Sequence, residues 1–439
     1  MGPSDDNRKK ARSDGMVASI LRDVSLPKMC LLRQEFDPRK IDDIESAVRE
    51  ALRRQGTLER VQPGTEIAVT AGSRGIANIA LILRTVVAEL VRVGARPFLV
   101  PAMGSHGGCT GAGQKKVLEG YGITEEFTAC PIRSSMETIQ IAETPSGLPV
   151  YIDKHAFEAA GIVVVNRIKY HTAFRGIYES GLLKMITIGL GKQKGAELCH
   201  GLGLRSMSRS IQEISGAVIA TGKILFGLGI VENAYDQTRT IRAIPAEALA
   251  DEEPALLMEA KEHMPSIPFE EIDVLVVDEI GKDISGGGMD PNITGTFVDP
   301  LMEGGIRVQR TVVLKLTEET RGNATGLGRA DFTTQKVFDD FDFEATYPNI
   351  LTPKIIPPGK IPLVLATDAL AIKAAIKTCE GLDTRPPRIV RIKNSLTLDR
   401  LFISEALVGE AKMHPEVKKV SLPEFCEFDE GGNLSSVWE

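Results

Sequence analysis

The sequence predicts an α/β protein built from two domains with mainly parallel sheets. Apolar runs of strand length alternate along the chain with amphipathic helical stretches, which is the pattern of strand–helix–strand units. The runs at 162–165 and 274–277 contain only Val, Ile and Leu, as is typical of parallel strands buried on both faces. The length of 439 residues is sufficient for two or three domains.

Two kinds of sequence pattern predict the helices and strands. We expect strands at short apolar runs and helices where apolar residues recur every three or four positions. The expected strands are 66–70, 97–101, 162–166, 224–231, 274–278, 310–316 and 362–367. The expected helices are 41–54, 76–93, 113–121, 206–221 and 369–379.

Prolines and charges between residues 252 and 269 predict a domain boundary and a hinge for domain closure. Residues 1–16 are polar and lack the apolar core of a secretory signal, so we expect a disordered lead-in. The expected organisation is then an N-terminal catalytic domain at 17–265, a C-terminal α/β domain at 266–405 and a C-terminal segment at 406–439.

The overall composition excludes several classes of protein. The net charge of -7 argues against a general nucleic-acid binder. No apolar run reaches the roughly 18 residues that span a membrane. The six cysteines are scattered without a C-x-x-C pair, which argues against a zinc ribbon, an iron–sulfur cluster or a disulfide framework. We therefore expect a cytoplasmic protein that binds neither nucleic acid nor membrane.

Polar, glycine-rich loops directly follow four of the predicted strands. Ligands of parallel α/β sheets bind beyond the carboxyl ends of the strands, where such loops gather. Arg74, His106 and His171 lie in three of these loops, and Lys282 lies in a fourth, in the second domain. We therefore expect the first three side chains to converge on an active site in the cleft between the domains, with Lys282 facing them.

A lysine and a second histidine follow in the same glycine-rich segment. Lys184 either extends to the surface or acts as a nucleophile toward a carbonyl or thioacyl group. His200 supplies at most one ligand, so a metal there needs further ligands from elsewhere. His106 and His171 suit acid–base chemistry near neutral pH, although a loop histidine also commonly caps a helix. The glycines let backbone amides approach a ligand closely.

Arg74, His106, His171, Lys184 and His200, in this order, resemble the nickel-dependent lactate racemase family. The resemblance covers most of the chain and includes the Gly-Ser-His-Gly-Gly loop at 104–108 and the Ser-Gly-Leu-Leu-Lys segment at 180–184. The interval of sixteen residues between Lys184 and His200 is similar to the family's as well. The resemblance implies an isomerase, specifically a racemase or epimerase of 2-hydroxy acids.

The resemblance also implies a cofactor, the nickel pincer nucleotide (nickel-bound pyridinium-3-thioamide-5-thiocarboxylic acid mononucleotide). Lys184 matches the lysine that carries this cofactor covalently, and His200 matches the nickel ligand of the protein. Gly104, Gly107 and Gly181 would lie beside the cofactor. The implied partners are the cofactor-biosynthesis enzymes and a small 2-hydroxy acid substrate, and a homodimer is compatible with the family.

His106 and His171 match the two acid–base histidines on opposite faces of the substrate. Arg74 matches the arginine near the substrate carboxylate, and Lys282 is the cation we assign to the second domain. In the implied reaction, one histidine takes the hydroxyl proton while the Cα hydride moves to the cofactor. The hydride then returns to the opposite face of a planar 2-oxo acid.

Two departures from the family pattern bear on the substrate. Ala71 occupies a position where the family often has aspartate, and the loop at 286–292 differs from the usual sequence of the family. We therefore expect a substrate larger or more polar than lactate, such as an aldonic acid. Two alternatives stay open: a zinc-dependent hydrolase or lyase that uses the histidines, and a non-catalytic sugar-acid or nucleotide-binding protein of the same fold.

Overall fold

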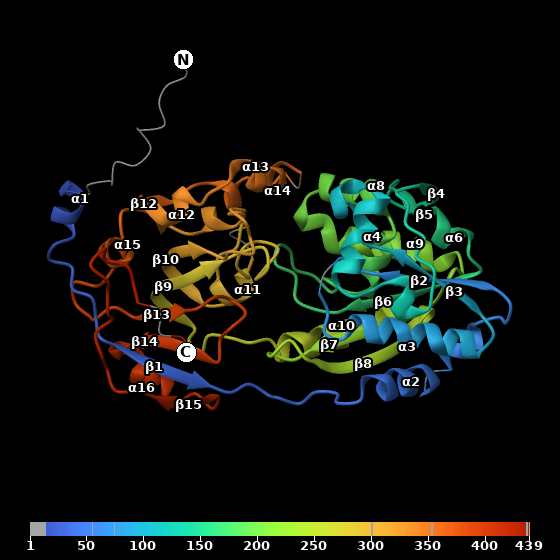
Figure 1. Cartoon of the computed structure of the whole chain (residues 1–439), viewed down its shortest axis with the longest axis horizontal. Helices are drawn as coiled ribbons and strands as arrows, with labels where there is room; N and C mark the ends of the chain where they lie inside the picture. Colours follow the sequence, from blue (N-terminus) through green and yellow to red (C-terminus); the bar gives the residue numbers. More distant parts are fainter. Residues whose placement is uncertain are drawn as a thin grey trace, which may run out of the picture. The chain divides into compact units, whose positions relative to one another are not determined.

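The structure is a computed structural model that describes residues 15–54, 56–73, 75–299, 302–352, 354–435 and 438. The chain divides into two compact units (Figure 1). Unit 1 comprises Met1–Phe36 and Pro265–Glu439, and unit 2 comprises Asp37–Met264. Arg74 lies outside the described residues. In the described part of the chain, no helix has both the length and the apolar character needed to cross a membrane.

These units differ from the expected domains at their ends. The expected boundary near residue 265 coincides with the start of the second segment of unit 1. Residues 17–36, however, belong with the C-terminal half, because strand β1 (Met29–Gln34) pairs with β14 (Arg400–Ser404) and β15 (Val417–Val420). The segment at 406–439 is likewise part of unit 1, since it contributes β15 to the same sheet.

Most of the expected boundary segment at 252–269 is a helix and not a linker, and a hinge motion there stays a prediction. Helix α10 (Leu249–Glu262) runs through it and tolerates Pro254 in its early turns. The helix buries Glu253, Leu256 and Leu257, so this segment is anchored in the core of unit 2. Prolines and charges alone did not distinguish a linker from an amphipathic helix.

Unit 2 contains a five-stranded sheet in the order β3-β2-β6-β7-β8, counted over the described residues. The first four strands are parallel, and β8 is an antiparallel edge strand. Because β2 and β6 are almost entirely buried, they carry the continuous apolar runs from which they were predicted. The strands are β2 (Glu66–Ala71), β3 (Arg96–Pro101), β6 (Gly161–Arg167), β7 (Ile224–Glu232) and β8 (Thr238–Pro245).

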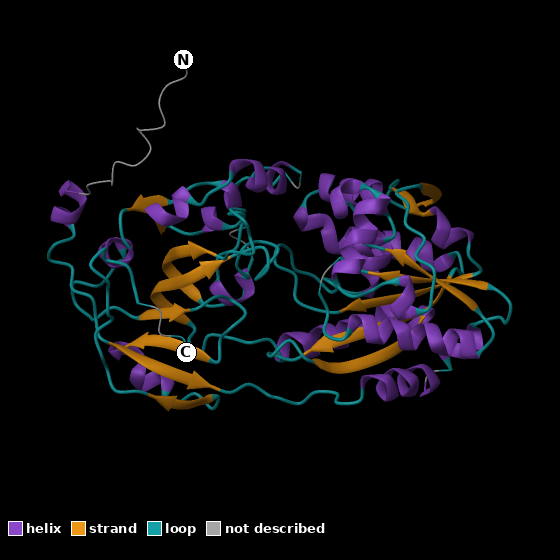
Figure 2. Cartoon of the chain, viewed as in Figure 1, coloured by secondary structure: helices purple, strands orange, loops and turns teal. Residues whose placement is uncertain are grey.

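Helices lie on both sides of this sheet (Figure 2). Their apolar faces form one continuous core with the strands, and α3 alone buries Ile82, Leu83 and Val86. A small hairpin of β4 (Thr138–Glu143) and β5 (Pro149–Asp153) packs beside α9. The helices are α2 (Ile44–Arg54), α3 (Ile79–Arg92), α4 (Gly111–Gly120), α5 (Glu125–Thr128), α6 (Lys154–Glu158), α7 (Leu182–Lys184), α8 (Lys192–Gly201), α9 (Met207–Ala220) and α10.

Unit 1 contains an eight-stranded sheet, within the described residues, in the order β12-β11-β10-β9-β13-β14-β1-β15. The strands from β12 to β13 are parallel, and β14, β1 and β15 are antiparallel to their neighbours. The further strands are β9 (Glu271–Ile280), β10 (Arg307–Leu316), β11 (Phe332–Thr334), β12 (Leu363–Leu365) and β13 (Ile389–Ile392). The helices are α1 (Gly15–Ile20), α11 (Pro291–Thr294), α12 (Gln335–Asp339), α13 (Phe343–Thr346), α14 (Pro348–Leu351), α15 (Asp368–Thr378) and α16 (Val408–Ala411).

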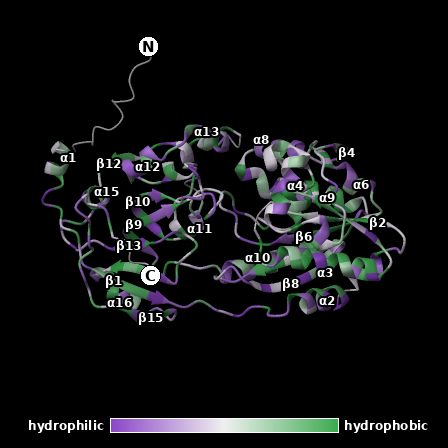
Figure 3. Ribbon diagram, viewed as in Figure 1, coloured by the Kyte–Doolittle hydropathy of each residue, from purple (hydrophilic) through white to green (hydrophobic). Residues whose placement is uncertain are grey.

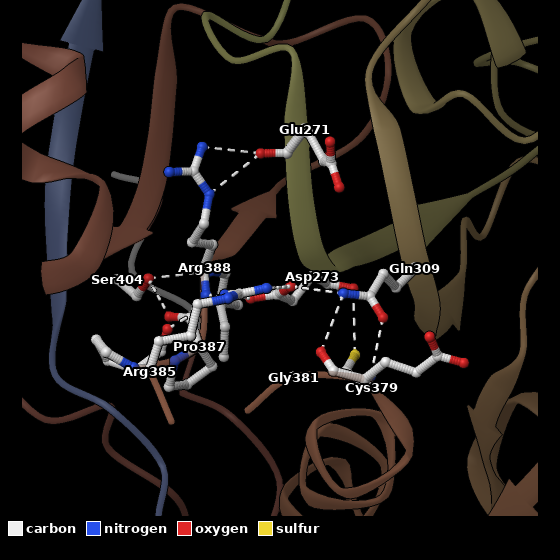
Figure 4. Close-up of polar contacts among 12 residues, drawn as sticks. Glu271, Asp273, Gln309, Cys379, Gly381, Arg385, Pro387, Arg388 and Ser404 are labelled. Atoms are coloured by element: carbon white, nitrogen blue, oxygen red, sulfur yellow. Dashed lines mark hydrogen bonds and ion pairs between the residues drawn. The ribbon is translucent and has the colours of Figure 1, made fainter. Parts of the chain in front are cut away.

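Hydrophobic residues concentrate in the helices and strands of each unit, and the connecting loops are more hydrophilic (Figure 3). The buried carboxylate of Asp273 is an exception at the start of β9. Arg385 binds it with two contacts of 2.6 Å, and Gln309 donates a hydrogen bond of 2.8 Å (Figure 4). These partners offset the cost of burying the charge and join β9 to β10 and to the chain before β13.

The predicted fold class is confirmed: both large sheets are mixed but mostly parallel, with helices between the strands. All seven expected strands and all five expected helices are present, with ends that differ by a few residues. The unexpected strands include β8, β14 and β15. They were not predicted because they are short or mixed in polarity, as is common for antiparallel and edge strands.

Candidate functional site

The loops that carry His106 and His171 leave neighbouring parts of one sheet. His106 follows β3 and His171 follows β6, and these two strands flank β2. Since all three strands are parallel, their carboxyl ends meet at the same edge of the sheet. The predicted convergence of these two loops is therefore supported by the strand order of unit 2.

The loop of His106 is tightly held, although the imidazole itself is exposed. Its Nδ1 lies 2.8 Å from the carbonyl oxygen of Met103. Because a carbonyl only accepts, Nδ1 carries the proton and the neutral ring keeps its lone pair on Nε2. His106 thus presents a nitrogen that can accept a proton from a ligand.

Lys184 and His200 lie at the two ends of one irregular helical segment. The segment begins with α7, continues as a π-helix at Met185–Gly189 and ends with α8. Gly104 donates a backbone hydrogen bond of 3.3 Å to the carbonyl of Gly189, so the His106 loop packs directly on the π-helix. Short π-helical turns are frequent at functional sites because they displace side chains from regular helical spacing.

His171 is half-buried beneath an aromatic neighbour. Its ring lies 4.1 Å from the ring of Phe174, centre to centre, and its Nδ1 accepts a hydrogen bond of 3.0 Å from the amide of Ala173. The neutral ring therefore holds its proton on Nε2. The buried carboxylate of Glu179 fixes the loop by accepting a 2.7 Å hydrogen bond from the His171 amide and pairing with Lys261 at 3.0 Å.

Electrostatics connect His171, Lys184 and His200. Burial, and then the positive charge of Lys184, lowers the pKa of His171 well below its ordinary value, with smaller effects from Lys169, His200 and Arg175. The pKa of His200 is lowered by burial and by Lys184 as well. The amine of Lys184 also lies 5.4 Å from the ring centre of Phe174. Lys184 and His171 thus lie beside the same ring, that of Phe174, and His200 lies within electrostatic reach of His171.

The three predicted glycines each have a steric role in the fold. Gly104 and Gly107 have φ values of 58° and 68°, which other residues rarely adopt. A Cβ on Gly107 would lie 2.6 Å from the backbone of α4, and a Cβ on Gly181 would lie 2.2 Å from Oε1 of Glu253. These contacts account for glycine at all three positions, and contact with a cofactor stays a prediction.

Glu253 supports the Lys184 segment and was missed by sequence reasoning, which assigned it to a linker. It is buried on α10 and accepts a 2.9 Å hydrogen bond from the amide of Leu183. Burial raises the pKa of this carboxyl to about 7, and the amides of Leu183 and Leu182 only partly oppose the shift. No local sequence pattern around Glu253 indicates this position.

We predict that Glu253 makes the stability of the protein fall with rising pH. Its pKa in the folded state is above the value of about 4.3 in an unfolded chain, so the folded state binds the proton more tightly. The resulting stabilisation is complete below about pH 4.3 and is lost as the pH rises through about 7. Between about pH 4.5 and 8, we expect Glu253 to lower the free energy of unfolding of the wild type by up to about 3 kcal/mol. Glu253→Gln should not show this decrease.

Urea denaturation at several pH values measures this effect. Glu143→Gln is a suitable control because it removes an exposed carboxyl from β4 in the same unit. If both variants and the wild type show the same dependence on pH, Glu253 does not have the assigned role.

Lys282 lies in unit 1, in the loop after β9. Its amine donates a 2.7 Å hydrogen bond to the carbonyl of Gly286, and its amide donates to Oγ1 of Thr320. Arg329 binds the same loop through the carbonyls of Gly287 and Met289. Lys282 thus helps to shape its own loop, and its contact with a substrate, like the cleft between the domains, stays a prediction.

The described residues do not by themselves form a metal centre. Among the described residues, no three His, Cys, Asp or Glu side chains are grouped so as to hold a metal ion. A zinc hydrolase needs three or more such ligands from the protein, and the described residues do not provide this ligand set. A metal whose remaining ligands come from a cofactor needs only one protein ligand, and His200 fits that requirement.

Comparison with known proteins shows similarity to lactate racemases. Residues 22–211 match the family model described as the lactate racemase N-terminal domain. The chain is also similar to the structure of the lactate racemase apoprotein from Thermoanaerobacterium thermosaccharolyticum, with a TM-score of 0.52 and 14% sequence identity. The similarity covers 83% of this chain and 94% of that one, and at this identity it shows a common fold. No curated protein sequence matches the chain.

Proposed function

We propose that the chain is a lactate racemase-like protein that racemises or epimerises a 2-hydroxy acid, because residues 22–211 match the lactate racemase N-terminal domain and the fold is similar to that of a lactate racemase apoprotein. The observation that carries the proposal is that Lys184 and His171 lie beside the same ring, that of Phe174, in a region of unit 2 that also contains the cations Lys169 and Arg175. A carboxylate substrate is attracted to such a region.

The two loop histidines supply proton transfer in this proposal. His106 has its proton held on Nδ1 by the carbonyl of Met103, so its Nε2 can accept the proton of the substrate hydroxyl. The neutral ring of His171 has its proton on Nε2, because its Nδ1 accepts from Ala173. His171 can therefore donate a hydrogen bond to a substrate oxygen before any proton is transferred.

We further propose that the protein carries a nickel pincer nucleotide. When bound, this group would supply the hydride acceptor that protein side chains lack. Lys184 would hold it through the amine, and His200 would ligate the metal through an imidazole nitrogen. Two properties of the site favour this: the lowered pKa keeps the imidazole of His200 neutral and able to ligate, and the surrounding positive charge suits a phosphate.

The substrate is proposed to be larger or more polar than lactate, such as an aldonic acid. Lys169 and Arg175 both influence the pKa of His171 and so lie within electrostatic reach of it. Arg175 donates a 2.7 Å hydrogen bond to the carbonyl of His171 and stacks at 4.0 Å from the ring centre of Tyr170. These groups could bind additional hydroxyls, which lactate lacks.

Production of the protein together with the cofactor-biosynthesis enzymes tests the proposal. We expect intact-mass analysis to show a covalent adduct, nickel to co-purify, and chiral chromatography to show conversion of one enantiomer or epimer of a 2-hydroxy acid into the other. Lactate and a series of aldonic acids are the substrates to compare.

A known lactate racemase, produced with the same enzymes, serves as the positive control. If that control is loaded and this chain carries neither adduct nor nickel, the cofactor proposal is wrong. Bound zinc with hydrolase activity would instead support the metal-dependent alternative, and ligand binding without turnover would support the non-catalytic one.

A further inference from the structure

Lys192 is a fully buried lysine at the first position of α8. Its φ of 52° lies in the left-handed region, which lysine seldom occupies. Burial of an ammonium group costs several kcal/mol unless the group is paired and hydrogen-bonded. The ammonium group of Lys192 therefore needs specific partners that offset both costs.

The partners of Lys192 come from three other elements of unit 2. Its amine lies 3.1 Å from Oδ2 of the buried Asp153, at the end of β5, and forms an ion pair with it. It donates a 3.0 Å hydrogen bond to Oε1 of Gln114 on α4 and another to the carbonyl of Pro101, the last residue of β3. We refer to Lys192, Asp153 and Gln114 as the buried brace.

Gln114 connects the brace to the loop of His106. With its Oε1 occupied by Lys192, its Nε2 donates to the carbonyl of Gly104 at 2.9 Å and to the carbonyl of His106 at 3.3 Å. Both ends of the Gln114 amide are thus satisfied in a site with no exposure to solvent. An unbroken chain of polar contacts therefore leads from the start of α8 to the backbone of His106.

We propose that Lys192 and Gln114 are positioning residues that fix His106 relative to α8, the helix on which His200 lies. The catalytic meaning of this position rests on the proposed function, because His106 is assigned there as the proton acceptor. The mechanical role of the brace does not depend on that assignment. A displacement of about 1 Å at a reacting group is enough to reduce turnover by about 100-fold.

Amide hydrogen exchange in the protein without cofactor tests the mechanical role. Gln114→Leu removes the two hydrogen bonds to the loop, and we expect exchange in residues 102–108 to become at least about 10-fold faster. Gln34→Leu is the matched control, because Gln34 is buried in unit 1 and its Nε2 also donates to two backbone carbonyls, those of Ser266 and Leu398.

Gln114→Glu provides a second variant in case the leucine side chain disrupts folding. It keeps the size of the side chain and the contact with Lys192 but replaces the donor to Gly104 and His106 with an acceptor. We expect the same faster exchange in residues 102–108. The proposal is overturned if exchange in this loop stays at the wild-type rate in both Gln114 variants, or if Gln34→Leu accelerates it equally.

The kinetic consequence is measured on the loaded enzyme. In the Gln114 variants we expect kcat for racemisation to fall by about 10- to 100-fold with little change in KM, because the substrate still binds and only the proton acceptor is displaced. An equal fall after Gln34→Leu would contradict the positioning role. If no substrate is racemised by the wild type, the proposed function fails, whereas the exchange experiment still decides the role of the brace.

Discussion

Lys184→Met is expected to abolish both the covalent adduct and racemisation. Methionine keeps an unbranched apolar side chain but lacks the amine, which lies 5.4 Å from the ring centre of Phe174 and would form the bond with a cofactor. Since protein side chains do not accept hydride, we expect the activity to fall by at least about 10⁴-fold, to the limit of detection. Intact-mass analysis and chiral chromatography of the variant, co-produced with the cofactor-biosynthesis enzymes, measure the two effects.

A second consequence of Lys184→Met does not involve the cofactor. The charge of Lys184 contributes to the lowered pKa of both His171 and His200, so its removal should raise both values. Imidazole titrations by NMR would detect the change in the unloaded protein. Lys194→Met is the control, because Lys194 is an exposed lysine on the same helical segment. Retention of the adduct in Lys184→Met would show that the cofactor is attached elsewhere.

Gly113→Ala is expected to lower the free energy of unfolding by about 3 kcal/mol or more. The new Cβ would lie 1.8 Å from the carbonyl oxygen of Gly107, which is far inside van der Waals contact. The clash is with backbone, so no side-chain rotation relieves it, and α4 must separate from the loop of His106. We therefore expect loss of racemisation even in the fraction of the protein that stays folded.

Gly120→Ala is the matched control on the same helix. A Cβ at Gly120 meets nothing within 4 Å, so alanine should be neutral or should stabilise α4 by up to about 1 kcal/mol. Urea denaturation compares the two variants directly. Equal stability of Gly113→Ala and Gly120→Ala would mean that the close crossing of α4 and the loop does not exist in solution.

The sequence by itself determined the fold class and predicted the residues of the site. Buried parallel strands such as β6 need Val, Ile and Leu on both faces, so their positions can be read directly from the chain. The loops that follow such strands meet at one edge of the sheet, which is why the order of strands and loops along the chain was enough to assign His106 and His171 to a common site. The roles predicted for Lys184 and His200 came from the resemblance to the lactate racemase family.

Only the tertiary structure decided which residues hold that site in place. Glu253, Lys192 and Gln114 are ordinary polar residues in the sequence, and each acquires its role from partners that lie far away along the chain. The same is true of β1, which joins a sheet formed by residues more than 230 positions later. Pairing over such distances depends on which surfaces meet on folding. Local apolar periodicity predicts the type of element but not its distant partners.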